Sequence, residues 1–278
     1  MLIGTHVSIA GGIEKAPARA AAEGATCFQI FTRSPQGGSA LPLTPELIKK
    51  FKAACQEFGF TEWYVHTPYF INLASGQLRN RAFTVQVVRG ELERASALGA
   101  KYVMTHLGSA RETGKARGLK LVAQGLRQVL RGYRGSAGLL LEISAGAGET
   151  VGSRFADLGW LLKQVPAVTG ICFDTEHAFA AGYELRTLAG IRQTFKEFDA
   201  SIGLRYLKMS HVNDSKVALG AQVDRHEHIG QGHIGQAGFR LLLQKSPLQD
   251  IPLILETEPD DREQDVALLK KLCISKAK

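Results

Sequence analysis

Glu62-Trp63-Tyr64-Val65-His66 and Tyr102-Val103-Met104-Thr105-His106 are two short apolar runs, each of which ends on a histidine. Between them, apolar residues recur at helical spacing from Val85 to Leu98. Gly99 follows at the position where glycine commonly ends a helix. A strand, a helix and a second strand in this order form the unit that builds a parallel sheet covered by helices. Residues 62–106 therefore predict one such unit.

The same order of elements repeats on both sides of this stretch. A second helix is indicated by Thr44 as its cap and by Pro45 in its first turn. The apolar stripe of this helix runs from Leu47 to Phe58 and ends at Gly59. We expect strands at Leu2–His6, Thr26–Thr32, Glu62–His66, Tyr102–His106, Leu139–Glu142, Gly170–Asp174, Tyr206–His211 and Pro252–Glu256. So many strand-then-helix units favour a closed barrel over an open doubly wound sheet, which usually has fewer strands.

The predicted fold is therefore α/β, a single (β/α)8 TIM barrel with its active site at the carboxyl ends of the strands. The chain has 278 residues, of which 45% are hydrophobic and 22% are charged, the composition of an ordinary globular protein. No linker or composition break divides it, so we expect one domain over residues 1–278. Disordered and fibrous proteins are excluded by this composition.

Membrane and export signals are missing from the sequence. No apolar run approaches the roughly 18–20 residues that a bilayer span needs, so an integral membrane protein is not expected. The opening residues, Met1–Val7, lack the basic flank and long apolar stretch of a secretory signal. We therefore expect a cytoplasmic protein.

Cysteines and net charge narrow the class of protein further. Cys27, Cys55, Cys172 and Cys273 are far apart in the sequence, which predicts reduced thiols rather than disulfides or a thiolate zinc cage. The chain carries 34 Lys and Arg against 26 Asp and Glu, a net charge of +8. This excess favours polyanionic partners such as nucleic acid, although many basic proteins bind none.

The residues that end the predicted strands are the informative feature for function. In parallel barrels, the strands' carboxyl ends form one face, where the chemistry gathers. A single histidine at a strand end is more often a satisfied core residue, and buried unpaired carboxylates are unfavourable. Here, however, seven of the eight expected strands end on an imidazole or a carboxylate: His6, His66, His106, Glu142, Asp174, His211 and Glu256. Together these residues predict a functional rim.

Two further clusters lie just beyond strand ends, Asp174-Thr175-Glu176-His177 and Asp224-Arg225-His226. Imidazole and carboxylate ligands without thiolates suit zinc, manganese or iron, and several carboxylates can bridge neighbouring ions. In phosphoester cleavage, paired metals make a nucleophile from water and stabilise both the attacking and the departing oxygen. The sequence therefore predicts a multinuclear metal site.

Longer motifs are more specific than this supply of ligands. They are His6-Val7-Ser8 with Gly11-Gly12, Phe173-Asp174-Thr175-Glu176-His177-Ala178-Phe179-Ala180-Ala181-Gly182-Tyr183, His211-Val212-Asn213-Asp214-Ser215-Lys216, Asp224-Arg225-His226-Glu227-His228-Ile229-Gly230-Gln231-Gly232-His233-Ile234-Gly235 and Ile254-Leu255-Glu256-Thr257. On these residues the chain resembles the endonuclease IV class of apurinic/apyrimidinic (AP) DNA-repair endonucleases. The resemblance covers nearly the whole chain.

The resemblance implies three zinc ions, with Mn²⁺ as an alternative at one position. His66 and His106 would hold the first ion, and Glu142, the expected catalytic residue, would bridge it to the second. The remaining implied ligands are Asp174, His211 and Glu256 for the second ion and His177, Asp224 and His226 for the third. Every ligand position of the family is therefore occupied here by a suitable residue.

The resemblance also implies the reaction and the partner. The expected substrate is damaged double-stranded DNA, cut on the 5′ side of an abasic site to leave a 3′-hydroxyl and a 5′-deoxyribose phosphate. A zinc-bound hydroxide would attack the phosphorus, and the third ion would neutralise the departing 3′ oxygen. An abasic nucleotide is the easiest to turn out of the stack, because no base remains to unpair. We expect a monomer, with no membrane partner.

The expected DNA contacts come from rim loops. Tyr69 and Phe70 stand where the family inserts side chains into the base stack, although a loop cap over the barrel is the alternative. Arg33, Lys216 and Arg225 are expected to contact phosphates, against the alternative of ordinary solvated charges.

Three departures from the family pattern fall around the same rim. After the second strand, Gln36-Gly37-Gly38 replaces the usual basic residue and tryptophan of a loop that penetrates DNA. Ile143-Ser144 replaces an Asn-Thr pair beside the bridging carboxylate. Glu176 replaces a small residue next to His177, where its charge either lies near the third ion or points to solvent.

Two other functions compete with the nuclease. A sugar isomerase or epimerase on the same barrel would need one divalent ion, held by Glu142, Asp174, His211 and Glu256, but not the other ligands. A lesion-binding protein with reduced turnover is the third hypothesis, suggested by the altered loop. Of the remaining histidines, His6 is expected to form hydrogen bonds near the pocket, and His228 and His233 are expected to be exposed or to face phosphate rather than to bind metal.

Overall fold

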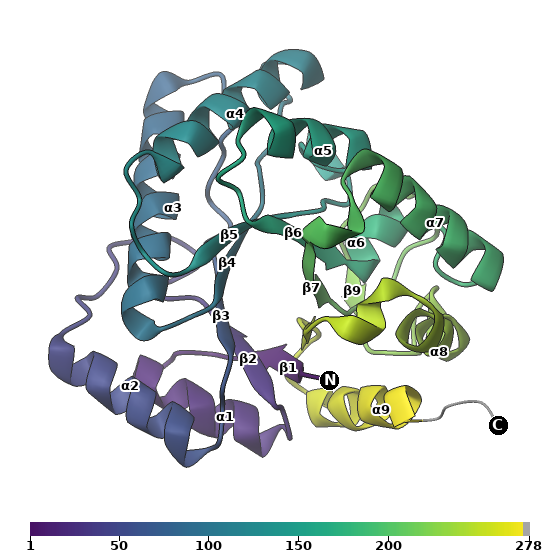
Figure 1. Cartoon of the computed structure of the whole chain (residues 1–278), viewed down its shortest axis with the longest axis horizontal. Coiled ribbons are helices and arrows are strands. Elements are labelled where there is room, and N and C mark those ends of the chain that lie inside the picture. The colour runs from purple at the N-terminus through teal and green to yellow at the C-terminus, as the bar shows by residue number, and fades with distance from the viewer. Residues whose placement is uncertain (275–278) are drawn as a thin grey trace.

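The computed structural model describes residues 1–274 and shows a closed barrel of parallel strands surrounded by helices (Figure 1). The barrel strands follow the order β1-β10-β7-β6-β5-β4-β3-β2, and β1 closes the ring by pairing with both β2 and β10. Their bounds are β1 Ile3–His6, β2 Cys27–Ile30, β3 Trp63–His66, β4 Tyr102–Thr105, β5 Gly138–Glu142, β6 Gly170–Asp174, β7 Leu207–His211 and β10 Leu253–Leu255. The predicted TIM barrel is confirmed.

Helices follow the strands and cover the outside of the barrel (Figure 1). They are α1 Ala16–Ala22, α2 Pro45–Glu57, α3 Leu78–Leu98, α4 Lys115–Leu130, α5 Phe155–Gln164, α6 Thr175–Ala180, α7 Leu188–Ser201, α8 Gly235–Lys245 and α9 Arg262–Ile274. A small antiparallel hairpin, β8 Asp214–Ser215 with β9 His226–Glu227, lies in the long connection after β7. Within the described residues, no helix is both long and apolar enough to cross a bilayer.

The two helices predicted in detail are present. The Thr44 hydroxyl accepts a hydrogen bond from the Leu47 N–H and so caps α2, as expected from the Thr-Pro pair. Gly99 ends α3 in the left-handed conformation, with a φ of 83°. One member of the expected apolar stripe, Phe58, is 42% exposed, because α2 ends before it and it points away from the core.

A layer of apolar side chains fills the barrel interior. Its members are fully buried and come from successive strands: Cys27, Tyr64, Met104, Leu140, Cys172, Met209 and Ile254. The corresponding position on β1 is Gly4, which pairs with Cys27. A β-carbon at Gly4 would lie 2.2 Å from the Cys27 carbonyl oxygen, so only glycine fits there. This packed layer closes the barrel below the carboxyl ends of its strands.

Candidate metal centre

Strand geometry places the strand-end residues directly above the apolar interior layer. Side chains two positions apart on a strand point to the same side, so each residue two positions beyond the layer also faces inward. These residues are His6, Gln29, His66, His106, Glu142, Asp174, His211 and Glu256. The predicted functional rim is thus the next interior layer of the barrel, and Gln29 belongs to it too.

A first group of ligand atoms comes from β3, β4 and β5. His66 Nε2 lies 3.0 Å from Glu142 Oε2, and His106 Nε2 lies 3.6 Å from the same oxygen. The other ring nitrogen of His66, Nδ1, donates a hydrogen bond of 2.6 Å to the Thr67 carbonyl, which leaves Nε2 free to face Glu142. This arrangement suits a divalent cation between the two imidazoles and the carboxylate.

A second group surrounds His211 and shares Glu142 with the first. His211 Nδ1 lies 2.8 Å from Glu142 Oε1, 3.1 Å from Glu256 Oε2 and 3.8 Å from Asp174 Oδ2. All of these side chains except Glu256 are fully buried, so three carboxylates face one imidazole away from water. Because buried carboxylates need a compensating charge, the set fits a cation better than it fits an apolar core.

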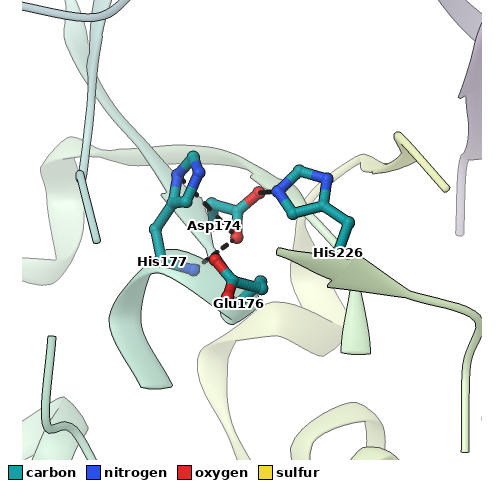
Figure 2. Close-up of side chains that lie close together, drawn as sticks. All are labelled: Asp174, Glu176, His177 and His226. Atoms are coloured by element: carbon teal, nitrogen blue, oxygen red, sulfur yellow. Dashed lines mark hydrogen bonds and ion pairs between the residues drawn. The ribbon is translucent and has the colours of Figure 1, made fainter. Parts of the chain in front are cut away.

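A third group lies at the start of α6, beside the hairpin (Figure 2). Figure 2 shows the Asp174 carboxylate between the rings of His177 and His226, with Glu176 beside it. Ligand atoms of these four residues all lie within 4.8 Å of one another. Asp224, the implied third ligand, is half exposed and contacts both rings, at 3.2 Å from His177 Nε2 and 3.5 Å from His226 Nε2. The side chains of the third implied ligand set therefore lie together, with Glu176 beside them.

The clustered charges shift pKa values in both directions. Burial alone would lower the pKa of His66, but the hydrogen bond and the negative charge of Glu142 outweigh burial and raise it. Burial dominates at His106 and lowers its pKa. Burial also opposes ionisation of Glu142, yet the charges of His106 and His211 and its hydrogen bonds hold its pKa well below the usual range. Glu142 is therefore an ionised carboxylate at neutral pH, as a bridging ligand must be.

Known proteins share the fold and much of the sequence of this chain. Residues 17–272 match the family model described as xylose isomerase-like TIM barrel. The chain is 40% identical over 275 residues to the probable endonuclease 4 of Nitrosopumilus maritimus, which covers 98% of each chain. The chain belongs to the endonuclease 4 family. The resemblance seen in the sequence is thereby confirmed.

Solved structures of the endonuclease 4 family and of other barrels differ in how closely they superpose on this chain. Endonuclease IV from Thermus thermophilus superposes with a TM-score of 0.87 and 34% identity, covering 98% of each chain. A D-tagatose 3-epimerase-like protein superposes with a TM-score of 0.71 at 20% identity, over 98% of this chain and 97% of the other. At that identity the second comparison shows a shared fold and nothing more.

A buried amide orients two candidate ligands of this endonuclease 4 family member. The Gln29 amide oxygen accepts a hydrogen bond of 2.9 Å from His211 Nε2, so His211 turns Nδ1 toward the carboxylates. The Gln29 amide nitrogen donates to Glu256 Oε1 at 2.6 Å and to His6 Nδ1 at 2.8 Å. His6 thus forms hydrogen bonds near the pocket, as expected. Sequence reasoning missed Gln29, although a glutamine within the apolar strand Cys27–Ile30 is a usable signal.

Replacing Gln29 with leucine should weaken zinc binding by roughly 10-fold to 100-fold, the usual effect of removing an outer hydrogen-bond partner. The reason is that His211 and Glu256 would lose the group that orients them. Competition with a chromogenic zinc chelator would measure the change. Gln56→Leu, at an exposed site on α2, is the matched control and should bind zinc like the parent. An unchanged affinity in Gln29→Leu would show that the amide has no such role.

The Ile143-Ser144 departure leaves one outer contact in place. His177 Nδ1 donates a hydrogen bond of 3.0 Å to the Ile143 carbonyl, a backbone group that any residue provides. The Ile143 side chain itself is buried in the core. His177 Nε2 is consequently directed toward Asp224 despite the loss of the family's asparagine side chain.

Two buried carboxylates hold the glycine-rich loop of residues 228–235 beside the third group. Asp214 accepts hydrogen bonds from the backbone N–H groups of Ser215, Gly230, Gly232, Ile234 and Gly235, at 2.8 to 3.1 Å. Asp265 on α9 accepts from His228 Nδ1 at 2.7 Å and from the Ile229 N–H at 2.9 Å. His233 is exposed, whereas His228 is half-buried against Asp265, so the expected exposure holds for His233 alone.

An open cavity of about 330 Å³ adjoins the ligand groups. His106, His177 and Asp224 contribute to its wall, and so does the exposed ring of Tyr69. The wall also includes the small residues Ser144, Ala145 and Ala147. The first and third ligand groups are therefore accessible from this cavity.

The side chains that are expected to contact DNA differ in their exposure to solvent. Tyr69 is 64% exposed and leans edge-on against Phe31, with the ring centroids 5.3 Å apart. Phe70 is half-buried and stacks on Phe83 of α3. Lys216 and Arg225 are exposed on the hairpin. The structure thus leaves Tyr69, Lys216 and Arg225 available at the rim.

Arg33, another of the expected phosphate contacts, has a buried partner within the protein. Its guanidinium forms an ion pair with Glu91 of α3, whose side chain is fully buried. The Thr32 hydroxyl donates to the same carboxylate, and Arg94 donates to the Thr32 hydroxyl and carbonyl oxygens. Because releasing Arg33 would leave a buried carboxylate without its cation, this ion pair fixes the loop after β2. A phosphate contact from Arg33 stays a prediction.

Proposed function

We propose that the protein hydrolyses the phosphodiester on the 5′ side of abasic sites in duplex DNA, leaving a 3′-hydroxyl and a 5′-deoxyribose phosphate. The observation that supports this most is the joining of three ligand groups into one cluster at an accessible rim. Glu142 belongs to the first and second groups, and Asp174 belongs to the second and third. A cluster of this kind suits several neighbouring cations, which phosphodiester hydrolysis uses and sugar isomerisation does not need.

Three sets of side chains would hold the cations. His66, His106 and Glu142 would hold one, and Asp174, His211 and Glu256 would hold the second together with Glu142. His177, Asp224 and His226 would hold the third. When bound, zinc supplies Lewis acidity, which lowers the pKa of water and stabilises negative charge on phosphate oxygens. His226 Nε2 is buried and forms no hydrogen bond, and such an ion would satisfy it.

Other residues would bind and orient the nucleic acid. We assign Tyr69, with Phe70 behind it, to the base stack next to the lesion, because Tyr69 is the exposed aromatic side chain beside the cavity. Lys216 and Arg225 would contact phosphates from the hairpin that carries His226. The abasic nucleotide would enter the 330 Å³ cavity. One copy of the chain contains all of these groups, so we expect a monomer to be active.

The deciding experiment offers the zinc-loaded protein a labelled duplex with one abasic analogue, the same duplex without the lesion, and a panel of ketoses. Incision on the 5′ side of the lesion, loss of incision with a strong chelator and its return with added zinc are the expected results. Binding without incision would instead identify a lesion-binding protein. Conversion of a ketose with intact DNA would identify an isomerase or epimerase.

Binding of the abasic duplex should weaken steeply with salt, by about 10³-fold between roughly 50 and 200 mM if six phosphates are contacted. Displaced counterions drive such association, and the chain is basic, with a net charge of +8. Fluorescence anisotropy with calcium in place of zinc would measure the slope. Arg225→Ala should reduce the slope by about one.

The matched control for Arg225 is Arg134, which is exposed in the loop that precedes β5. This loop lies at the amino ends of the strands, on the face opposite the ligand groups, so Arg134→Ala should leave the slope unchanged. A binding curve that does not depend on salt would point to a small uncharged substrate instead.

A further inference from the structure

Glu176 is a buried carboxylate for which the mechanism above has no role. It lies in the first turn of α6 and is 0% exposed. Its Oε1 accepts hydrogen bonds from the Ser215 hydroxyl at 3.1 Å and from the Arg225 N–H at 3.2 Å. Its Oε2 has no hydrogen-bond partner. Of the two alternatives left open by the sequence, exposure to solvent is therefore wrong.

The surroundings of Glu176 do not neutralise it. No lysine or arginine within residues 1–274 forms an ion pair with its carboxylate. The Arg225 guanidinium turns away and donates to the Asp224 carbonyl. Among the nearest groups is a second carboxylate, Asp174, which adds repulsion (Figure 2). A buried carboxylate in this position is favourable if it takes up a proton or if a positive charge joins it.

The nearest groups that can share such a charge are metal ligands. Ligand atoms of Asp174, His177 and His226 lie within 4.8 Å of a Glu176 oxygen and of one another. Glu176 Oε2 and His226 Nε2 are both buried and both without a hydrogen-bond partner. A cation in the third group would satisfy both atoms at once.

We propose that Glu176 is an additional ligand of the third cation position, to which it adds a carboxylate oxygen. This inference rests on the proposed function only in taking the third group to be a cation site. With Asp174, Glu176 and Asp224 as its oxygen donors, the position holds more carboxylates than imidazoles. Such a donor set suits Mn²⁺, whereas imidazole-rich sets suit zinc. Glu176 therefore tunes which ion the third position prefers.

A structural role for Glu176 makes a different prediction. If Glu176 serves only to accept hydrogen bonds from Ser215 and Arg225, one acceptor oxygen is sufficient. A glutamine amide oxygen would accept the same two hydrogen bonds. Glu176→Gln keeps the size and these acceptors but removes the charged ligand. Ser215→Ala does the reverse, because it removes one hydrogen bond and leaves the carboxylate.

The test titrates the metal-free protein with Mn²⁺ and counts bound ions by electron paramagnetic resonance. Glu176→Gln should bind one Mn²⁺ fewer than the parent or bind it at least about tenfold more weakly, while Ser215→Ala matches the parent. Glu176→Asp, which keeps the charge but shortens the side chain, should also lower the affinity for that Mn²⁺ ion. Unchanged Mn²⁺ binding in Glu176→Gln, or equal loss in Ser215→Ala, would overturn the assignment.

The same proteins should be assayed on the abasic duplex to separate this inference from the proposed function. Loss of one Mn²⁺ in Glu176→Gln, with no incision by any of the proteins, would reject the nuclease and retain the ligand. Incision by the parent with unchanged Mn²⁺ binding in Glu176→Gln would retain the nuclease and reject the ligand.

Discussion

Replacing Glu142 with glutamine should lower the rate of abasic-site incision by about 10³-fold or more, because one side chain serves two ligand groups. Its Oε2 faces His66 at 3.0 Å and its Oε1 faces His211 at 2.8 Å. Glutamine has nearly the same shape but carries no charge, so both groups would lose their shared anion. Single-turnover incision at saturating enzyme would measure the loss.

The control for Glu142→Gln is Glu57→Gln, an exposed position at the end of α2. This variant should incise the duplex like the parent. Thermal unfolding should show that Glu142→Gln is folded, because the substitution removes a buried charge and creates no cavity. Incision at the parental rate by folded Glu142→Gln would refute the metal mechanism.

Asp214→Ala should lower the free energy of unfolding by roughly 3–5 kcal/mol, a large effect for one side chain. The substitution would leave the backbone N–H groups of Ser215, Gly230, Gly232, Ile234 and Gly235 without their buried acceptor. Ser215 pairs with His226 in the hairpin, so the third ligand group would loosen as well. Urea unfolding would measure the stability, and hydrogen exchange would follow residues 228–235.

Asp260→Ala is the matched control, since Asp260 is an exposed carboxylate in the loop before α9. It should leave both the unfolding curve and the exchange of residues 228–235 unchanged. If Asp214→Ala unfolded within about 0.5 kcal/mol of the parent, as ordinary surface substitutions do, the loop would have to be held in another way.

The barrel and its rim were predictable because both follow from the alternation of side-chain direction along each strand. Each strand was recognisable as a short apolar run, and the rule that every second residue faces the same side placed the terminal histidines and carboxylates together. His106 and Glu256 illustrate the limit of precision: each lies one residue past the end of its strand, yet still faces inward. The ends of the strands were uncertain by one or two residues, whereas the direction of the side chains was not.

The residues that sequence reasoning missed depend on long-range packing. Gln29 contacts His211 and Glu256, which are 182 and 227 residues away, so its role could not be read from neighbours in the sequence. Arg33 lies on a rim loop, where a phosphate contact is expected. Its buried ion-pair partner, Glu91, comes from α3 and could not be identified from the neighbouring sequence. Local patterns show which residue types are present, and only the folded chain shows which partner each one meets.

Anomalous diffraction from zinc-soaked crystals tests the central claim most directly, because it locates the ions without relying on activity. The account predicts three zinc peaks: one beside His66 and His106, one beside His211 and Glu256, and one between His177 and His226. A single peak beside His211 and Glu256, with the other two positions empty at saturating zinc, would contradict a multinuclear centre and favour an isomerase-type site.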